Sequence, residues 1–379
     1  MSTPEDGPPT VGVKSSRDLS ALPGVLETWL AGKMTAGSFP RVTGLSAPSS
    51  TGMSTETVVF DADWADGDGE HHERLVARIP PDPADMPIFP VYDIPKQYRV
   101  MSKVRELTEV PVPELMWLEE DPSLLGQPFL VMRCVEGQVP PDNPPYTFGD
   151  NWLFDAPSAA QRRLQERTVA VLAGLHAAGG AESNFDFLQD RVRGDTPLRR
   201  LFQREIVDYY EWVSVDVRSP LLERGLRTLE DKWPSDEGPA ALSWGDARIG
   251  NIMYRDFEPV AVLDWEMASL GPREVDVAWC QWFHEFFQGV VTGFGLAGMP
   301  GFMRRDDFLA TYEKLTGHSC RDMDWYALLA AVRFGINALR LGLRGIHFGQ
   351  SQMPDDVDEL IFHRADMEEM ISGTYWAGR

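Results

Sequence analysis

The chain has 379 residues, of which 43% are hydrophobic and 11% aromatic, and its formal net charge is −23 at pH 7. A chain of this length and composition can bury a large core and is more typical of two lobes than of one. The negative charge argues against nucleic acid or an anionic membrane as a partner, because both would be repelled. It leaves two interpretations open, which are solubility alone and attraction of cationic small molecules.

The first residues and the cysteines indicate a cytoplasmic protein. Residues 1–16, MSTPEDGPPTVGVKSS, contain acidic residues and prolines but no apolar core, so we expect a disordered leader and no secretory signal. The three cysteines, Cys134, Cys280 and Cys320, lie far apart without metal-ligand spacing. We therefore expect no disulfide and a reducing compartment.

The most apolar stretch near the C-terminus, LLAAVRFGINALRLGL, is interrupted by Arg333, Asn337 and Arg340. It also falls short of the roughly 20 residues that a helix needs to cross a bilayer. We therefore expect no transmembrane helix.

The first elements predict a small lobe rich in strands. Residues 18–33 have the apolar spacing of a helix, with Asp18 as a candidate N-cap. The segments TETVVFDADW and ERLVARIP, joined by the turn-rich ADGDGEHH, predict a β-hairpin. A helix, a strand and a buried strand are then expected over KQYRVMSKVREL, VPVPELMWLEED and PFLVMRCVEG, in that order.

Helical patterns dominate after Ala159, and AAQRRLQERTVAVLAGLHAAG is the clearest of them. The exceptions are two short β-like runs, NIMYRD and VAVLDWE, which predict a second hairpin through FEP. We therefore predict a lobe over residues 17–135 and a larger, mainly helical lobe over residues 136–379.

The second hairpin brings together three polar residues. The stretch WGDARIGN carries Asp246 and Asn251 in the loop before it, and VAVLDWE delivers Asp264 at the end of its second strand. Phosphoryl transfer needs such a set, namely a carboxylate to accept the proton of an attacking hydroxyl and oxygen ligands for Mg²⁺ on the nucleotide phosphates. Carboxylate and amide oxygens suit this hard cation, and no Cys or His is needed.

These segments resemble a known family. WGDARIGNIMY followed by VLDWEMASLGPREVDVAW resembles the H-G-D-x-x-x-x-N and D-x-E segments of the aminoglycoside phosphotransferase and choline kinase-like family, a relative of protein kinases. The resemblance runs from about Ala21 to Arg344, and it is closer to uncharacterised actinobacterial members and to kinase domains fused to acyl-CoA dehydrogenases. It implies an α+β, bilobal protein-kinase-like fold with a small antiparallel-sheet N-lobe and a large helical C-lobe.

The resemblance also implies roles for the motif residues. Asp246 would be the catalytic base, Asn251 and Asp264 would hold magnesium, and Asp276 in REVDVAW would brace the loop. Trp244 stands where the family usually has a histidine that buttresses the loop. Its presence need not abolish activity.

The N-lobe is expected to bind ATP, or alternatively GTP. Residues of SAPSSTGMSTETVVF stand where the family has its nucleotide-covering hairpin. Gly52 would permit a tight turn there, and hydroxyl groups would face the phosphates from Ser50, Thr51 and Ser54.

Arg78 in LVARIPP stands at the strand position where kinases carry a phosphate-binding lysine. Its expected helix glutamate is replaced by Gln97, which offers no charge. The orientation of Arg78 would then be weaker unless Asp93 or another carboxylate takes that place.

The strand FLVMRCVEG resembles the linker between the lobes. Met132 would stand at the entrance of the adenine pocket, and backbone groups of Arg133 and Val135 would face the purine edge.

We therefore predict an ATP- and Mg²⁺-dependent phosphotransferase acting on a hydroxyl of a small molecule, with no nucleic-acid or membrane partner. Gln97 and Trp244 motivate one alternative, a nucleotide-binding pseudokinase or regulatory module. The acceptor stays open. An aminosugar would suit an acidic cup, whereas a hydroxyacyl-CoA would need basic residues such as those on the last long helix, Arg333, Arg340 and Arg344. Trp279, Trp282 and His284 are more typical of core packing than of a ligand cage.

Overall fold

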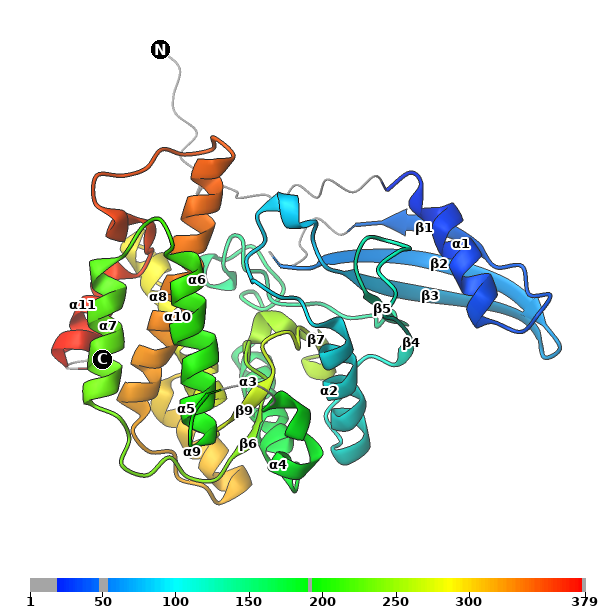
Figure 1. Ribbon diagram of the computed structural model, residues 1–379. Coiled ribbons are helices and arrows are strands. Elements are labelled where there is room, and N and C mark those ends of the chain that lie inside the picture. The colour runs from blue at the N-terminus through cyan, green and yellow to red at the C-terminus, as the bar shows by residue number, and fades with distance from the viewer. Residues whose placement is uncertain (1–18, 48–53, 190–192, 377–379) are drawn as a thin grey trace, which may run out of the picture.

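The structure is a computed structural model that describes residues 19–47, 54–189 and 193–376. An antiparallel sheet of five strands forms one lobe, and helices form most of the other (Figure 1). The strand order is β1-β2-β3-β5-β4, with bounds Arg41–Ser46, Glu56–Asp66, Gly69–Ile79, Phe129–Arg133 and Leu115–Glu119 for the strands in that order. This α+β, bilobal arrangement is the one that the sequence predicts.

The predicted hairpin forms the centre of the sheet. β2 and β3 pair in unbroken register from Glu56 with Ile79 to Asp66 with Gly69. Alternate residues of β2 point into an apolar layer, and helix α1 (Leu22–Lys33) covers that layer through Leu26 and Leu30. The predicted helix thus begins at Leu22, while its predicted cap Asp18 lies outside the described residues.

Helix α2 (Ile94–Leu107) covers the other face of the sheet. Its N-cap is Asp93, whose side chain accepts a hydrogen bond from the Lys96 amide at 2.8 Å. The buried Val100 and Val104 of α2 belong to the same apolar cluster as residues of the helical lobe. The two lobes therefore share one continuous core beneath α2.

The second lobe contains the remaining helices, which have the following bounds: α3 Ser158–His176, α4 Ala181–Asn184, α5 Pro197–Phe202, α6 Tyr209–Val213, α7 Pro220–Asp231, α8 Glu274–Gly293, α9 Arg305–Thr316, α10 Met323–His347 and α11 Arg364–Ser372. A π-helical turn over Gln203–Asp208 joins α5 to α6. α8 and α10 pack against each other at the centre of the lobe (Figure 1).

Two short strand pairs carry the motif residues. β7 (Ile252–Arg255) and β8 (Glu258–Val262) form the predicted second hairpin. β6 (Ala241–Ser243) pairs with β9 (Ser269–Gly271), and the motif loop follows β6 directly. The sequence patterns did not predict β1, β6 or β9.

The proposed boundary at residue 135 falls in a short connection. β5 ends at Arg133, and the next paired residue, Gln138, already bridges to Tyr254 of the helical lobe. Helix α10 is long and apolar enough to cross a membrane by length and composition, but 72% of its most apolar window is buried inside the protein. That burial is typical of a core helix.

Candidate active site

Asp276 fixes the backbone of the motif loop. It is fully buried in the first turn of α8, and it accepts hydrogen bonds from the Ser243 hydroxyl at 2.8 Å and from the amides of Trp244 and Gly245 at 2.7 and 3.0 Å. Burial works to raise the pKa of Asp276, but hydrogen bonds from His176, Gly245 and Ser243 outweigh it and lower that pKa. Asp276 therefore stays ionised and braces the loop.

Gly245 is required at the turn before Asp246. Its φ is +94°, and a Cβ there would lie 2.3 Å from the carbonyl oxygen of Met267. Any side chain at this position would push the loop away from the brace.

The Asp246 carboxylate is held from three sides. Asn251 Nδ2 donates to its Oδ2 at 2.6 Å, and Trp279 Nε1 donates to its Oδ1 at 2.8 Å. Arg248 Nε lies 3.2 Å from both oxygens. The side chain of Asp246 is 17% exposed, so it is fixed by protein groups yet still reachable from outside.

Asp264 lies next to this group. The Leu263 amide donates to the Asn251 carbonyl at 2.9 Å, which joins the loop to the end of the β7–β8 hairpin. Asp264 has a φ of +62°, which is an uncommon conformation for a non-glycine residue. The structure thus brings Asp246, Asn251 and Asp264 together, as their spacing predicted.

Asn251 and Asp264 fit a magnesium ion by chemistry. Both Asn251 donor contacts go to Asp246, one to Oδ2 and one to the main-chain carbonyl at 3.1 Å, so the amide oxygen remains for a metal. With the Asp264 carboxylate, it supplies the hard oxygen ligands that Mg²⁺ prefers.

Arg78 reaches across from β3 to Asp264. Its Nη2 donates to Asp264 Oδ1 at 2.8 Å, with only 13% and 12% of the two side chains exposed. Gln97 is buried, and its Nε2 has no partner among the described residues, while Asp93 caps α2. The carboxylate that compensates for Gln97 is therefore Asp264 and not Asp93.

Trp244 buttresses the loop as expected. It is fully buried, donates from Nε1 to the Leu263 carbonyl at 2.8 Å and packs against Trp265 at 5.9 Å between ring centroids. The indole thus connects the loop to the Asp264 segment by a hydrogen bond.

The predicted phosphate loop is described only in part. Ser50, Thr51 and Gly52 lie outside the described residues, while Ser54 hydrogen-bonds to the Glu266 carboxylate. Burial, followed by the charge of Asp264, raises the pKa of Glu266 to about 8. Lys96 donates from Nζ to the Glu266 carbonyl at 3.0 Å, and burial lowers its pKa to about 8.

The linker residues divide into two groups. Met132 is buried in β5, whereas the Val135 amide has no backbone partner among the described residues. Backbone groups of Arg133 were also expected to face the purine edge, but this is wrong for the Arg133 amide. That amide donates to the Glu114 carbonyl at 2.8 Å as part of the sheet. Its guanidinium pairs with Glu73 and Glu114 on the surface.

Several residues of the site were missed by sequence reasoning. These are Lys96, Arg248, Glu266 and Trp279, of which Trp279 was expected to be core packing only. Arg248 and Glu266 lie inside the motifs, so position alone could have flagged them. The contact between Trp279 and Asp246 depends on how α8 packs, and no local pattern signals it.

The three arginines of α10 differ in their surroundings. Arg333 is 2% exposed, pairs with Glu205 and donates to the Gly245 carbonyl at 3.1 Å, so it supports the loop and is not available to an acceptor. Arg340 donates to the Pro87 carbonyl from Nε and Nη2 at 2.9 and 2.8 Å and stacks over Trp212. Arg344 is 5% exposed, and the carboxylate of Asp85 is near enough for its charge to act on the Arg344 guanidinium.

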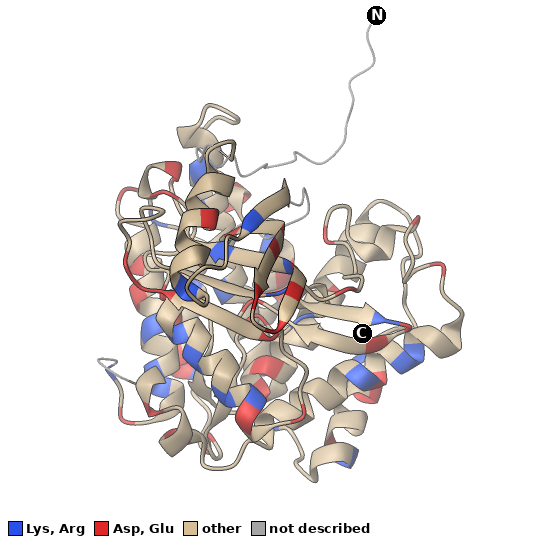
Figure 2. Ribbon diagram, turned by 90° about the vertical axis from the view of Figure 1, so that its right-hand side faces the viewer, with Lys and Arg blue, Asp and Glu red and all other residues tan. Residues whose placement is uncertain are grey.

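Charge is not separated by lobe. Figure 2 shows acidic and basic positions interspersed along the ribbon on the side where the sheet faces the viewer. Burial lowers the pKa of Arg340 and of Arg344. The charge of Arg344 adds to the lowering at Arg340, whereas the charge of Asp85 opposes the lowering at Arg344. The two arginines therefore lie close together, with one acidic group, Asp85, near Arg344.

Comparison with known proteins places the chain among phosphotransferases. Residues 60–315 match the family described as "Phosphotransferase enzyme family". A probable acyl-CoA dehydrogenase of Arabidopsis thaliana is 25% identical over 305 residues, covering 77% of this chain and 35% of that protein. Acyl-CoA dehydrogenase family member 11 of Gallus gallus is 29% identical over 205 residues, covering 52% and 24%. The chain thus spans about a third or less of these relatives.

Solved structures show the same fold. A Ralstonia eutropha protein assigned to the aminoglycoside phosphotransferases has a TM-score of 0.63 and 21% identity, covering 93% of this chain and 97% of that one. A thermostable mutant of the aminoglycoside phosphotransferase APH(4)-Ia, in a ternary complex with ADP and hygromycin B, has a TM-score of 0.53 and 17% identity, covering 93% of this chain and 99% of that one. A macrolide 2′-phosphotransferase of Brachybacterium faecium scores 0.53 at 16% identity, covering 91% and 99%.

Proposed function

We propose that this chain, which belongs to the phosphotransferase enzyme family, transfers the γ-phosphoryl group of ATP to a hydroxyl of a small molecule. The observation that carries the proposal is the position of Asp246, a partly exposed carboxylate held by Asn251 and Trp279 beside the Arg78–Asp264 pair. Positioning and electrostatic stabilisation are the main contributions that a protein makes to phosphoryl transfer.

Asp246 is the general base in this proposal. The acceptor hydroxyl donates a hydrogen bond to the carboxylate, which orients its oxygen toward the phosphorus and accepts its proton during transfer. Hydrogen bonds from Asn251 and Trp279 fix the direction of the carboxylate, so less ordering is needed at the moment of reaction. Arg248, next to the same carboxylate, can stabilise charge on the transferring group.

The nucleotide is held from both lobes. Arg78 offers a bidentate fork to phosphate oxygens, and the Val135 amide faces the purine edge. Asn251 and Asp264 hold magnesium, which when bound neutralises negative charge on the phosphates. Ser50, Thr51, Gly52 and Ser54 complete the phosphate loop of this proposal, and a cytoplasmic location is part of it.

ATP and GTP consumption with a panel of aminosugars, simple alcohols and hydroxyacyl-CoA esters tests this function. We expect turnover that depends on both the acceptor and Mg²⁺ and that is lost in Asp246→Asn. Nucleotide binding without turnover for any acceptor would instead support the pseudokinase alternative.

A hydroxyacyl-CoA is the second candidate acceptor class, and a specific observation favours it. Arg340 and Arg344 lie one helical turn apart on one face of α10, and two neighbouring cations attract an anionic group even though the charge of Asp85 partly offsets that of Arg344. The relatives named for acyl-CoA dehydrogenases carry a region similar to this chain. Transfer of phosphate to a hydroxyacyl-CoA would give a phosphorylated acyl-CoA, a compound of the chemical class for which these relatives are named.

A further inference from the structure

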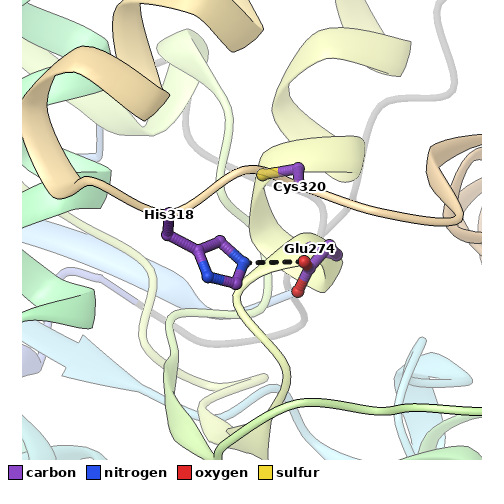
Figure 3. A group of neighbouring side chains, drawn as sticks. All are labelled: Glu274, His318 and Cys320. Carbon is purple, nitrogen blue, oxygen red and sulfur yellow. Dashed lines mark hydrogen bonds and ion pairs between the residues drawn. The ribbon is translucent and has the colours of Figure 1, made fainter.

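Three potential metal ligands lie close together at the start of α8, outside the candidate active site. Glu274 lies in the first turn of α8, and His318 and Cys320 lie in the connection from α9 to α10 (Figure 3). Their ligand atoms all lie within 4.8 Å of one another, and His318 Nε2 is 2.8 Å from Glu274 Oε1. Among the described residues, no other group of three His, Cys, Asp or Glu ligands is this close.

We propose that Glu274, His318 and Cys320 form a zinc site that fastens the α9–α10 connection to the start of α8. Zinc accepts this mixture of oxygen, nitrogen and sulfur ligands, whereas Mg²⁺ and Ca²⁺ prefer oxygen alone. Three protein ligands leave the fourth tetrahedral position to water. The proposal does not depend on the phosphotransferase activity.

The observed spacing is compatible with closure around an ion. Zinc bonds of about 2.0 to 2.3 Å place tetrahedral ligand atoms roughly 3.3 to 3.8 Å apart. The three atoms therefore need to move by about 1 Å or less. His318 and Cys320 lie in a loop connection, where side-chain rotation can supply this movement, while the helix fixes Glu274.

The local charges favour a cation. The Glu274 side chain is 7% exposed, and its carboxylate accepts hydrogen bonds from His318 at 2.8 Å and from the Arg321 amide at 3.3 Å. Glu274 and Glu313 face the Cys320 sulfur with negative charge, and Arg273 faces it with positive charge. Once the thiol has lost its proton, the thiolate and the two carboxylates outnumber the single guanidinium near this sulfur, so a divalent ion is attracted.

The thiol of Cys320 must lose its proton to bind zinc. Burial, followed by the charge of Glu274, raises the pKa of Cys320 to about 12, so the free thiol is protonated at neutral pH. Zinc binds the thiolate and displaces this proton to solvent.

The proposed zinc site lies close to Asp276, which braces the motif loop. Glu274 precedes by two residues Asp276, which braces the motif loop. On the other side, Tyr312 of α9 contacts His176 at 2.7 Å, and His176 lies 3.3 Å from Asp276. A zinc ion would thus tie α9, α10 and α8 together around the brace.

Metal content and a cobalt spectrum test the site. The full chain, purified from zinc-supplemented cells and dialysed, should contain close to one zinc per chain by mass spectrometry. Replacement by Co²⁺ should give a near-ultraviolet thiolate-to-cobalt charge-transfer band. Cys320→Ser should abolish the band, and Glu274→Gln should weaken cobalt binding at least about tenfold. Cys134→Ser and His347→Asn are matched controls that should retain it.

Zinc should also raise the unfolding temperature of the wild type and leave that of Cys320→Ser unchanged. A wild-type protein that shows no thiolate band with excess Co²⁺ at pH 8 would overturn the proposal, whether or not the variants fold. So would a band that survives Cys320→Ser or disappears in Cys134→Ser. Circular dichroism in the presence of a chelator shows whether each variant has kept its fold.

Discussion

Arg78 and Asp264 are 186 residues apart in the chain and form an ion pair of 2.8 Å between the two lobes. Both side chains are largely buried, so the pair is weakly screened and holds the sheet against the motif hairpin. In the proposed function these two groups face the phosphates and the magnesium ion. Because they are paired, a substitution at the proposed phosphate-binding Arg78 also affects the proposed magnesium ligand Asp264, and the reverse holds as well.

Asp264→Asn should weaken magnesium-dependent nucleotide binding by about tenfold to a hundredfold, because a charged ligand becomes a neutral one. Calorimetric titration of ATP with and without Mg²⁺ measures this. Asp256→Asn, at the exposed turn of the same hairpin, is the control and should bind as the wild type does. An unchanged magnesium dependence in Asp264→Asn would exclude the metal role.

Asp246→Ala should reduce kcat by a factor of about 10² to 10⁴, the range for a positioned general base. ATP affinity should change little, because Asp246 lies on the acceptor side of the proposed phosphate position. Single-turnover kinetics and nucleotide titration separate these two effects. If the best substrate turned over in the variant as in the wild type, another group would have to be the base.

Local patterns were sufficient for the elements whose residues are neighbours in the chain. The β2–β3 hairpin was predicted from alternating or apolar segments joined by turn residues, and α2 from its helical pattern, both close to their observed bounds. The grouping of Asp246, Asn251 and Asp264 was predictable for the same reason, since a short hairpin connects them.

Contacts between distant elements could not be predicted from such patterns. Trp279 looks like any aromatic residue of a buried helix, yet α8 packs so that its indole N–H meets Asp246. β6 and β9 are only three residues long each, too short for a periodic signal. The hydrogen bond from Arg340 to the Pro87 carbonyl likewise joins residues far apart in the chain, so no local pattern predicts it.

Trp279→Phe should lower kcat roughly tenfold, because it removes one hydrogen bond to a charged oxygen while keeping an aromatic ring. The KM for ATP should hardly change. Trp282→Phe is the matched control, since Trp282 lies on the same helix and its buried Nε1 has no partner among the described residues. Equal kcat losses in both variants would indicate packing alone.

Two buried histidines should make stability fall in mild acid. Burial lowers the pKa of His284 and of His363 to about 4, against about 6.5 in an unfolded chain. Between these values the unfolded state binds protons that the folded state does not, so stability decreases as pH falls from about 6.5 to about 4, by up to about 1.4 kcal/mol per pH unit for each histidine. Above about pH 6.5 this contribution is constant.

Denaturant unfolding at pH 7 and pH 5 measures the effect. Replacing one buried histidine, in His284→Gln, should reduce the stability loss between these pH values by about 2 kcal/mol. The exposed His347→Gln should leave the loss as in the wild type. If His284→Gln lost as much stability as the wild type over this range, the histidine would not be neutral in the folded state.

The acceptor class can be distinguished by salt and by Arg340. A polycationic aminosugar would be attracted by the net charge of −23, so its kcat/KM should fall as salt is added and the Debye length shrinks from about 30 to 10 Å.

An acyl-CoA is an anion, so the net charge of the protein would repel it and local arginines such as Arg340 would have to hold it. Arg340→Ala should therefore reduce activity toward a hydroxyacyl-CoA by about tenfold or more and spare an aminosugar. Arg162→Ala, whose side chain is 77% exposed on α3, is the control and should affect neither. Equal losses for both substrates in Arg340→Ala would assign this residue to holding the Pro87 loop and would remove the support for an anionic acceptor.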